Sequence, residues 1–336
     1  MNRRPAFSVI MPCHNRPDEL RWAIRSILDQ TLPDFELIVV NDASTNDVEQ
    51  AIRSFTDQRL RHIRNSVRLG AAGSRNRGIA AATGEYVSFL DADDMYLPNR
   101  LDRLADTIDA LGQPDVVCHR QFRLRESRTG VSTYEVIPAR APAAGEHLSD
   151  YLFREGNWLQ INCVTVKAAA AHALDFDTSM TLWEDTKYVL ELWNAGHRFA
   201  FSNDVLSVYF DEMRTSRASL QQSELLHAKI YQYLKLHCTP TSVRAFEATA
   251  LSNAIFFSHP LKALRYLVSG YRAGVPARRC LYQLARGMLG QRNMKALLSA
   301  AAARAPGSRA IPPELADLLA TQVRPDENET RTGTNG

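Results

Sequence analysis

The chain of 336 residues is long enough for about two domains and a large hydrophobic core. Hydrophobic residues make up 45% of it and charged residues 23%, and the net charge is only +3, which excludes a wholly disordered protein. Its 16 glycines and five cysteines exclude collagen-like and disulfide-rich classes, and the widely spaced cysteines indicate a reducing compartment with no zinc site.

Strand and helix patterns alternate over the first hundred residues. Short apolar runs predict buried strands, at 7–11, 35–40, 60–64 and 86–90. Patterns compatible with helices lie between them, at 18–30, 46–55 and 70–82, and a further helix is predicted to begin at Pro98. This alternation predicts a parallel sheet covered by helices.

A mixed pattern follows from about residue 115. Further strands are predicted, at 115–119, 161–166, 199–202 and 205–210, together with a loop or hairpin over 126–146 and a helix over 183–194. After about residue 220 only helical patterns remain, with breaks near Pro240, Pro260 and Pro276. The polar tail from about Pro325 is predicted to be disordered.

Polar clusters directly follow three of the predicted strands. They are Pro12-Cys13-His14-Asn15-Arg16, Asn41-Asp42-Ala43-Ser44 and Asp91-Ala92-Asp93-Asp94. Because ligands bind beyond the carboxyl ends of the strands in an open parallel sheet, we expect the three clusters to converge on one edge.

The cluster of three carboxylates at Asp91, Asp93 and Asp94 predicts a metal site. Their mutual repulsion is relieved by Mg²⁺ or Mn²⁺, which can also bridge to the phosphate oxygens of a ligand. The alternative is an acidic turn whose aspartates cap a helix.

Other polar residues have a binding and a structural interpretation. Asp42 and Ser44 can hydrogen-bond a base or ribose, or form an Asx or Ser turn. His14 can stack on a base, or be a structural turn residue. Arg75 and Asn76 lie near a helix start that favours anions, where an arginine can pair with a diphosphate, or they face solvent.

The triplet Trp183-Glu184-Asp185 opens a predicted helix. One of its acids can act as a general base, and the tryptophan can pack against an acceptor. The alternative is the ordinary preference for acids at a helix N-terminus.

These residues together resemble the large inverting glycosyltransferase family two, as found in bacterial cell-surface polysaccharide synthesis. The similarity runs from Ser8 to about Ser219 and rests on several segments in order: 9–16, 26–31, 35–44, 75–78, 84–94 and 183–185. The resemblance implies an α/β fold of the GT-A, nucleotide-diphospho-sugar transferase-like type. It has a mostly parallel sheet flanked by helices, followed here by a helical C-terminal extension.

The implied domains are a catalytic domain over 1–219, a basic helical region over 220–322 and a disordered tail over 323–336. Within the catalytic domain, 1–112 would bind the nucleotide sugar and 113–219 the acceptor.

Site roles follow from the resemblance position by position. Asp91 and Asp93 match the DXD motif that holds Mn²⁺ or Mg²⁺, with Asp93 as direct ligand, and Asp185 matches the catalytic base. Asp42 matches the acid that contacts the base, and Arg75 would offset charge on the departing diphosphate. The other implied substrate-binding residues are Pro12, His14, Asn15, Arg16, Ser44, Asn76, Asp91, Ala92, Trp183 and Glu184.

Two positions depart from the family pattern. The first of two adjacent acids after the second strand is replaced by Asn41, which loses one charge. The segment 209–219 lacks the histidine that many members carry there, so Arg214 or Arg217 is a candidate contact to the diphosphate instead.

The alternative function is a non-catalytic nucleotide-sugar-binding or scaffold protein on the same fold. Retention of Asp93 and Asp185 argues against it. A nucleotidyltransferase and a dinucleotide-binding oxidoreductase are disfavoured because no glycine-rich loop follows the first strand.

Charge is concentrated near the C-terminus: residues 221–310 contain 13 Lys and Arg against two acids, a net +11. Lys262, Arg265 and Arg272 share one helical face and Leu261, Leu264, Leu267, Val268 and Tyr271 another. This pattern predicts an anionic membrane surface as partner rather than nucleic acid. The family resemblance implies the other two partners, a UDP-sugar donor and a glycan or lipid-linked acceptor. We therefore expect a cytoplasmic protein, peripheral on the inner face of the cell membrane. The alternative is that the apolar faces pack on the catalytic domain or a second subunit, and the oligomeric state stays open.

Overall fold

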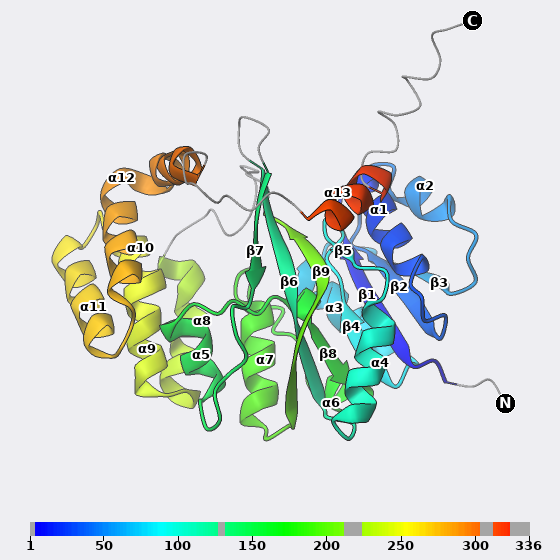
Figure 1. Cartoon of the computed structure of the whole chain (residues 1–336), viewed down its shortest axis with the longest axis horizontal. Helices are drawn as coiled ribbons and strands as arrows, with labels where there is room; N and C mark the ends of the chain where they lie inside the picture. The colour runs from blue at the N-terminus through cyan, green and yellow to red at the C-terminus, as the bar shows by residue number, and fades with distance from the viewer. Residues whose placement is uncertain (1–3, 127–131, 212–223, 303–311, 323–336) are drawn as a thin grey trace, which may run out of the picture.

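The computed structural model describes residues 4–126, 132–211, 224–302 and 312–322 (Figure 1). Arg214, Arg217 and the tail predicted to be disordered lie outside these residues. None of the helices in the described ranges is long and apolar enough to cross a bilayer.

A mixed sheet runs through the middle of the molecule (Figure 1). Its strands are β1 (Phe7–Cys13), β2 (Phe35–Asn41), β3 (Leu60–Arg64), β4 (Tyr86–Phe89), β5 (Met95–Tyr96), β6 (Val116–Glu126), β7 (Ser132–Ile137), β8 (Val164–Lys167) and β9 (Phe199–Phe210). The strand order is β3-β2-β1-β4-β8-β6-β9-β5, and β7 forms a hairpin with β6. The half β3-β2-β1-β4 is parallel, as predicted, whereas β8 joins β4 and β6 in antiparallel orientation. The α/β class with a helical C-terminal extension is confirmed, and the sheet is parallel mainly in its N-terminal half.

Helices cover both faces of the sheet. In chain order they are α1 (Pro17–Leu28), α2 (Val48–Arg53), α3 (Gly70–Ala81), α4 (Arg100–Ala110), α5 (Leu148–Arg154), α6 (Ala168–Ala173) and α7 (Glu184–Asn194). Residues of α1, α2 and α4 share one buried cluster with Val9 and Met11, whereas α3, α5, α6 and α7 share another with Ile10. Successive side chains of β1 thus enter opposite layers, which explains why its sequence is a continuous apolar run.

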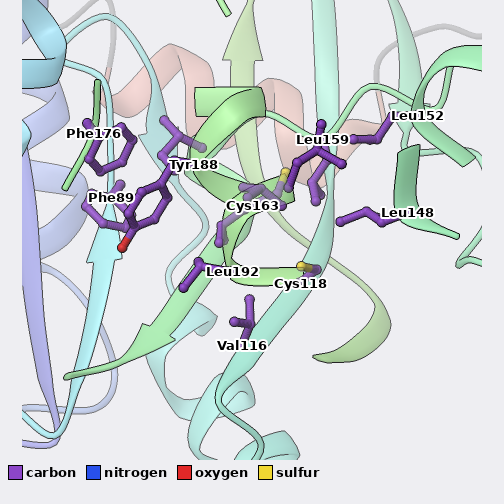
Figure 2. Close-up of a cluster of buried hydrophobic side chains, with 14 of the residues drawn as sticks. Phe89, Val116, Cys118, Leu148, Leu152, Leu159, Cys163, Phe176, Tyr188 and Leu192 are labelled. Carbon is purple, nitrogen blue, oxygen red and sulfur yellow. The ribbon is translucent and has the colours of Figure 1, made fainter. Parts of the chain in front are cut away.

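Aromatic packing anchors α7 to the second layer. The rings of Phe176 and Tyr188 stack with centroids 3.9 Å apart, and Phe89 of β4 meets Phe176 edge-on at 5.5 Å. Figure 2 shows these three rings together beside the buried Cys163 and Leu192. Because α7 begins at Glu184, this packing fixes where Glu184 and Asp185 lie relative to the end of β4.

The C-terminal region forms its own helical layer. It contains α8 (Glu224–His237), α9 (Pro240–Phe246), the π-helical turn η3 (Glu247–Leu251), α10 (Ser252–Ile255), α11 (Pro260–Arg272), α12 (Ala277–Ala302) and α13 (Pro313–Gln322). Phe246 packs against Phe153 of α5 at 5.4 Å between centroids, so the layer docks on the predicted acceptor half. The last helix, α13, returns to the other end of the sheet, where Leu315 packs with Met95 and Val208. The domain boundary near residue 219 stays a prediction.

Several predicted elements differ from the structure. Residues 199–210 form one strand rather than two. β9 pairs with β6 on both sides of the polar residues 202–204, which are the extra residues of an irregularity between the pairs Cys118–Phe201 and Arg120–Val205. The segment Ile161–Cys163 is a short 3₁₀ turn (η1), and the strand β8 begins only after it. The strand β5 and the helices α5 and α6 were not predicted from the sequence.

Candidate active site

The turns that follow β1, β2 and β4 meet at one edge of the sheet. In the order β2-β1-β4 the three strands are adjacent and parallel, so their carboxyl ends point the same way. The polar clusters at 12–16, 41–44 and 91–94 are therefore brought together as the sequence predicted.

Hydrogen bonds join the first two turns. The Nδ1 atom of His14 lies 2.8 Å from the backbone oxygen of Asp42, and the backbone N–H of Asn15 donates to Ser44 Oγ at 3.1 Å. Asn15 also accepts a hydrogen bond from the backbone N–H of Thr45, at 2.9 Å. These contacts hold His14, Asn15 and Ser44 in fixed positions, next to the partly exposed Pro12 at the end of β1.

Asp42 has a different environment from the one predicted. Its carboxylate is buried and accepts hydrogen bonds from Asn65 Nδ2 (2.8 Å) and from the backbone N–H groups of Leu69 (2.7 Å) and Gly70 (2.9 Å). These bonds anchor the start of α3. Asp42 therefore positions the start of α3, and its predicted contact with a base stays a prediction.

Asn41 has a local physical explanation. Its side-chain oxygen accepts from the backbone N–H of Ser44 at 3.0 Å, and its amide donates to Glu49. An aspartate at position 41 would lose this donor and face the Glu49 carboxylate. The amide therefore replaces an acid because Glu49 already supplies the negative charge.

The acidic turn separates its three carboxylates. Asp91 accepts a hydrogen bond from Arg75 Nη2 at 2.7 Å, and Asp93 forms an ion pair with Arg16. The side chains of both acids are about a quarter exposed. Asp94 is fully buried, with Phe210 N–H donating to it at 2.9 Å. Burial, and then the negative charges of Asp93 and Asp91, raise the pKa of Asp94 well above its usual range. Only the pair predicted as the metal-binding motif faces outward, since Ala92 is also buried.

Arg75 links the acidic turn to α7. Its guanidinium is buried, 3.2 Å from Glu184 Oε1 as well as 2.7 Å from Asp91 Oδ1. Burial opposes its charge, but Asp91, Glu184 and Asp185 outweigh burial and raise its pKa. Its buried Nε has no hydrogen-bond partner within the described residues. The sequence predicted contact with a diphosphate, and in this structure Arg75 instead holds the carboxylates together.

Asp185 lies in the first turn of α7 and is partly exposed. Its Oδ1 accepts from the backbone N–H of Thr186 at 2.6 Å. Burial and the charge of Glu184 raise the pKa of Asp185 to about 7, although Arg75 and the Thr186 N–H act to lower it. A carboxylate with a pKa near the operating pH is suited to accept a proton as a general base.

Trp183 points toward the C-terminal helices. Its indole N–H donates to His227 Nδ1 at 2.8 Å, and its ring packs 6.0 Å from Phe153 and 5.5 Å from Phe246. The ring thus holds α7 against α8 and α9, and its predicted packing against an acceptor stays a prediction. His227 and Phe246 carry no sequence signal for this contact.

Asn76 is also engaged inside the protein. Its amide oxygen accepts from the backbone N–H of Phe176 (2.8 Å) and its amide nitrogen donates to the same residue's carbonyl (2.9 Å). Asn76 thus anchors the segment that precedes α7, and its predicted substrate contact stays a prediction.

Asn162 belongs to the site although the sequence placed it in a strand. Its side-chain oxygen accepts from the backbone N–H of Asp91 at 2.9 Å, and its amide donates to Asp94. Its carbonyl accepts from the buried Arg100 at 3.2 Å. Asn162 therefore fixes the acidic turn from the side of β8.

The acidic turn fits a divalent cation shared with a ligand. Across the described part of the chain, no three His, Cys, Asp or Glu side chains gather into a metal site. Mg²⁺ and Mn²⁺ are commonly held by one or two carboxylates together with substrate phosphates and water. The outward carboxylates of Asp91 and Asp93 suit that arrangement.

Comparison with known proteins identifies the family. The sequence model described as Glycosyl transferase family 2 matches residues 8–166. Over these residues the chain resembles glycosyl transferase family 2. This confirms the predicted family and the glycosyltransferase class.

Relatives and solved structures extend the comparison. The chain is 26% identical over 255 residues to the amylovoran biosynthesis glycosyltransferase AmsB of Erwinia amylovora, covering 73% of this chain and 83% of AmsB. It is 36% identical over 95 residues to WfgD of Escherichia coli, a UDP-Glc:alpha-D-GlcNAc-diphosphoundecaprenol beta-1,3-glucosyltransferase, covering 28% of this chain and 38% of WfgD. The structure of S. aureus TarS 1–349 in complex with UDP-GlcNAc superimposes with a TM-score of 0.56 at 18% identity, covering 88% of this chain and 92% of TarS 1–349. The last similarity supports the fold alone.

Proposed function

We propose that this family 2 glycosyltransferase moves a sugar from a UDP-sugar to a hydroxyl group of a glycan or lipid-linked acceptor, with inversion at the anomeric carbon. One observation carries the proposal: Arg75 pairs both with Asp91 at the end of β4 and with Glu184, the neighbour of Asp185, whose pKa is about 7. A proton acceptor and a candidate diphosphate site thus lie in one network.

The proposed chemistry is a single displacement. Asp185 accepts the proton of the acceptor hydroxyl as its oxygen forms a bond to the anomeric carbon. The bond from that carbon to the diphosphate oxygen breaks, and UDP leaves with the electron pair. Because the acceptor attacks on the face opposite the diphosphate, the anomeric configuration inverts. Asp185 then returns the proton to solvent.

Asp91 and Asp93 would hold Mn²⁺ or Mg²⁺, which offsets negative charge on the diphosphate when bound. Arg75 keeps Asp91 in place, and Asn162 fixes the backbone of the same turn. Arg16 lies beside Asp93 and adds positive charge where the diphosphate would bind. His14, Asn15 and Ser44 form the side of the site proposed for the nucleoside.

The names of the relatives support the donor and acceptor classes. WfgD carries UDP-glucose and a diphosphoundecaprenol-linked sugar in its name. Other relatives are named for amylovoran, colanic acid and teichuronic acid biosynthesis. We therefore place the proposed reaction in the synthesis of a cell-surface polysaccharide.

A donor screen tests this function. The full chain is incubated with UDP-, GDP- and dTDP-sugars and a polyprenyl-diphosphate-linked sugar, with Mn²⁺, Mg²⁺ or a chelator, and nucleotide release is measured. We expect metal-dependent release from a UDP-sugar and a product of inverted anomeric configuration by NMR. A retained configuration contradicts the mechanism, and donor binding without turnover favours the non-catalytic alternative.

A further inference from the structure

The outer surface of α11 and the start of α12 is unusually apolar. Within the described residues, eight of the thirteen exposed large apolar side chains lie between Phe257 and Leu289. On α11 they are Leu261 (74% exposed), Leu264 (41%), Val268 (50%) and Tyr271 (60%). We call residues 257–289 with these side chains the α11–α12 surface. Such a concentration indicates an interaction surface.

The apolar side chains of α11 share one face, and it is not the face that packs on the protein. At about 100° per residue, the four exposed residues fall within an arc of about 80°. Ala263, Leu267 and Gly270 occupy the neighbouring arc of about 60° and are buried. The alternative interpretation of the sequence was that the apolar side chains of this region pack on the rest of the chain. On α11 this holds for the buried side chains, and within the described part of the chain the four exposed ones have no such packing.

Basic residues border the apolar arc. Lys262, Arg265 and Arg272 are exposed and follow it within about 100° of helix rotation, and Arg278 is exposed at the start of α12. The sequence from 248 to 313 contains ten Lys and Arg and no Asp or Glu. No acidic residue of this segment therefore neutralises the positive charge.

The combination selects an anionic lipid surface as the occupant. Helices that lie in the interface of a membrane bury an apolar face and place Lys and Arg against anionic headgroups. The core of an interface between protein subunits is instead depleted in charged residues, and in lysine especially. In Figure 1, α11 and α12 lie at the end of the molecule opposite α1 and α2, so docking there leaves the nucleotide-binding half in water.

We propose that the α11–α12 surface docks this protein on an anionic bilayer, with α11 lying in the plane of the membrane. The inference goes beyond the proposed function, because it depends on no donor, metal or acceptor. Its consequence is that an acceptor carried by a lipid is met at the membrane surface.

Vesicle flotation of the full chain tests the proposal. We expect it to float with phosphatidylcholine vesicles containing phosphatidylglycerol, less so at high salt, and not with phosphatidylcholine alone. Lys262→Gln/Arg265→Gln should weaken partitioning by about 30-fold. Leu261→Ser/Val268→Ser should weaken it by at least about tenfold, since both side chains are already exposed and the fold does not depend on them.

Matched pairs on the other half of the chain are the controls. Arg25→Gln/Arg53→Gln removes two exposed charges from α1 and α2, and Val67→Ser/Leu111→Ser removes two exposed apolar side chains. Both control pairs should float like the wild type.

Three results would overturn the proposal. They are no flotation of the wild type, equal losses in the control pairs, or a concentration-dependent dimer that Leu261→Ser/Val268→Ser dissociates while vesicles are ignored. The last result would make the surface a subunit interface. Nucleotide-sugar hydrolysis without vesicles is measured on the same samples, so that failure of the proposed function is recognised separately.

Discussion

Glu184→Gln should shift the pH dependence of sugar transfer toward acid. After burial, the Glu184 carboxylate is the main cause that raises the pKa of Asp185 to about 7. Glutamine has the same shape and can still accept from Arg75, but it removes the negative charge. The positive charge of Arg75, which lowers the pKa of Asp185, is then no longer opposed by the charge of Glu184. Loss of a neighbouring like charge lowers the pKa of a carboxyl group by about one pH unit, which corresponds to about 1.4 kcal/mol.

The sign follows from the role of Asp185 as a base. Protonated Asp185 is inactive, so kcat/KM falls as the pH drops below the pKa of the free enzyme. With a pKa of about 7, the wild type at pH 5 should retain about 1% of its plateau value; with a pKa near 6, Glu184→Gln should retain about 10%.

The assay is kcat/KM for the sugar donor between pH 5 and 9 at fixed metal concentration. Glu191→Gln is the matched control, since Glu191 lies about two turns further along α7 and pairs with Lys187. Its midpoint should stay near 7. If Glu184→Gln keeps the wild-type midpoint, Asp185 is not the group that limits the rate in acid.

Three further predictions concern the acidic turn. Asp93→Asn should weaken Mn²⁺-dependent UDP binding by several kcal/mol; calorimetry that finds equal UDP affinity with and without Mn²⁺ in both proteins would contradict the metal assignment. Arg16→Gln should tighten Mn²⁺ binding in the absence of nucleotide by about two- to fivefold, because Arg16 no longer competes with the metal ion for Asp93. The same substitution should weaken UDP binding. If the affinities for Mn²⁺ and for UDP both fall, Arg16 does not compete with the metal. Asn162→Ala should lower the free energy of unfolding by about 1–3 kcal/mol, since the Asp91 N–H and the buried Asp94 each lose a partner; a change below about 0.5 kcal/mol in urea unfolding would assign the turn to other contacts.

The N-terminal half of the fold could be predicted from the sequence, because there the hydrophobicity of each segment reflects its burial in the structure. β1, β2 and β4 are buried on both faces, so they appear as apolar runs, and the polar residues after them meet because parallel strands end on the same edge. The division of α11 into a buried and an exposed apolar side was not predicted. The sequence grouped Leu267 with Leu261 and Val268 on one face, and only packing against the other C-terminal helices buries Leu267 while the other two stay exposed.

The remainder depends on contacts between distant segments. Asn162 reaches the acidic turn only because β8 is inserted antiparallel beside β4, which nothing near residue 162 indicates. The contacts that Asp42 and Asn76 make inside the protein were not predicted, because a polar side chain after a strand or near a helix start looks alike whether it binds a substrate or its own chain. Their partners, Gly70 and Phe176, are set by how α3 and the segment before α7 pack.

The most direct test of the central claim compares Asp185→Asn with the wild type for sugar transfer at saturating donor and for UDP-sugar affinity in the same preparation. We predict transfer lower by about 10²–10⁴-fold with donor affinity nearly unchanged, because the substitution removes a proton acceptor and leaves the acidic turn at the end of β4 intact. Equal losses of affinity and rate, or an unchanged rate, would show that Asp185 is not the base.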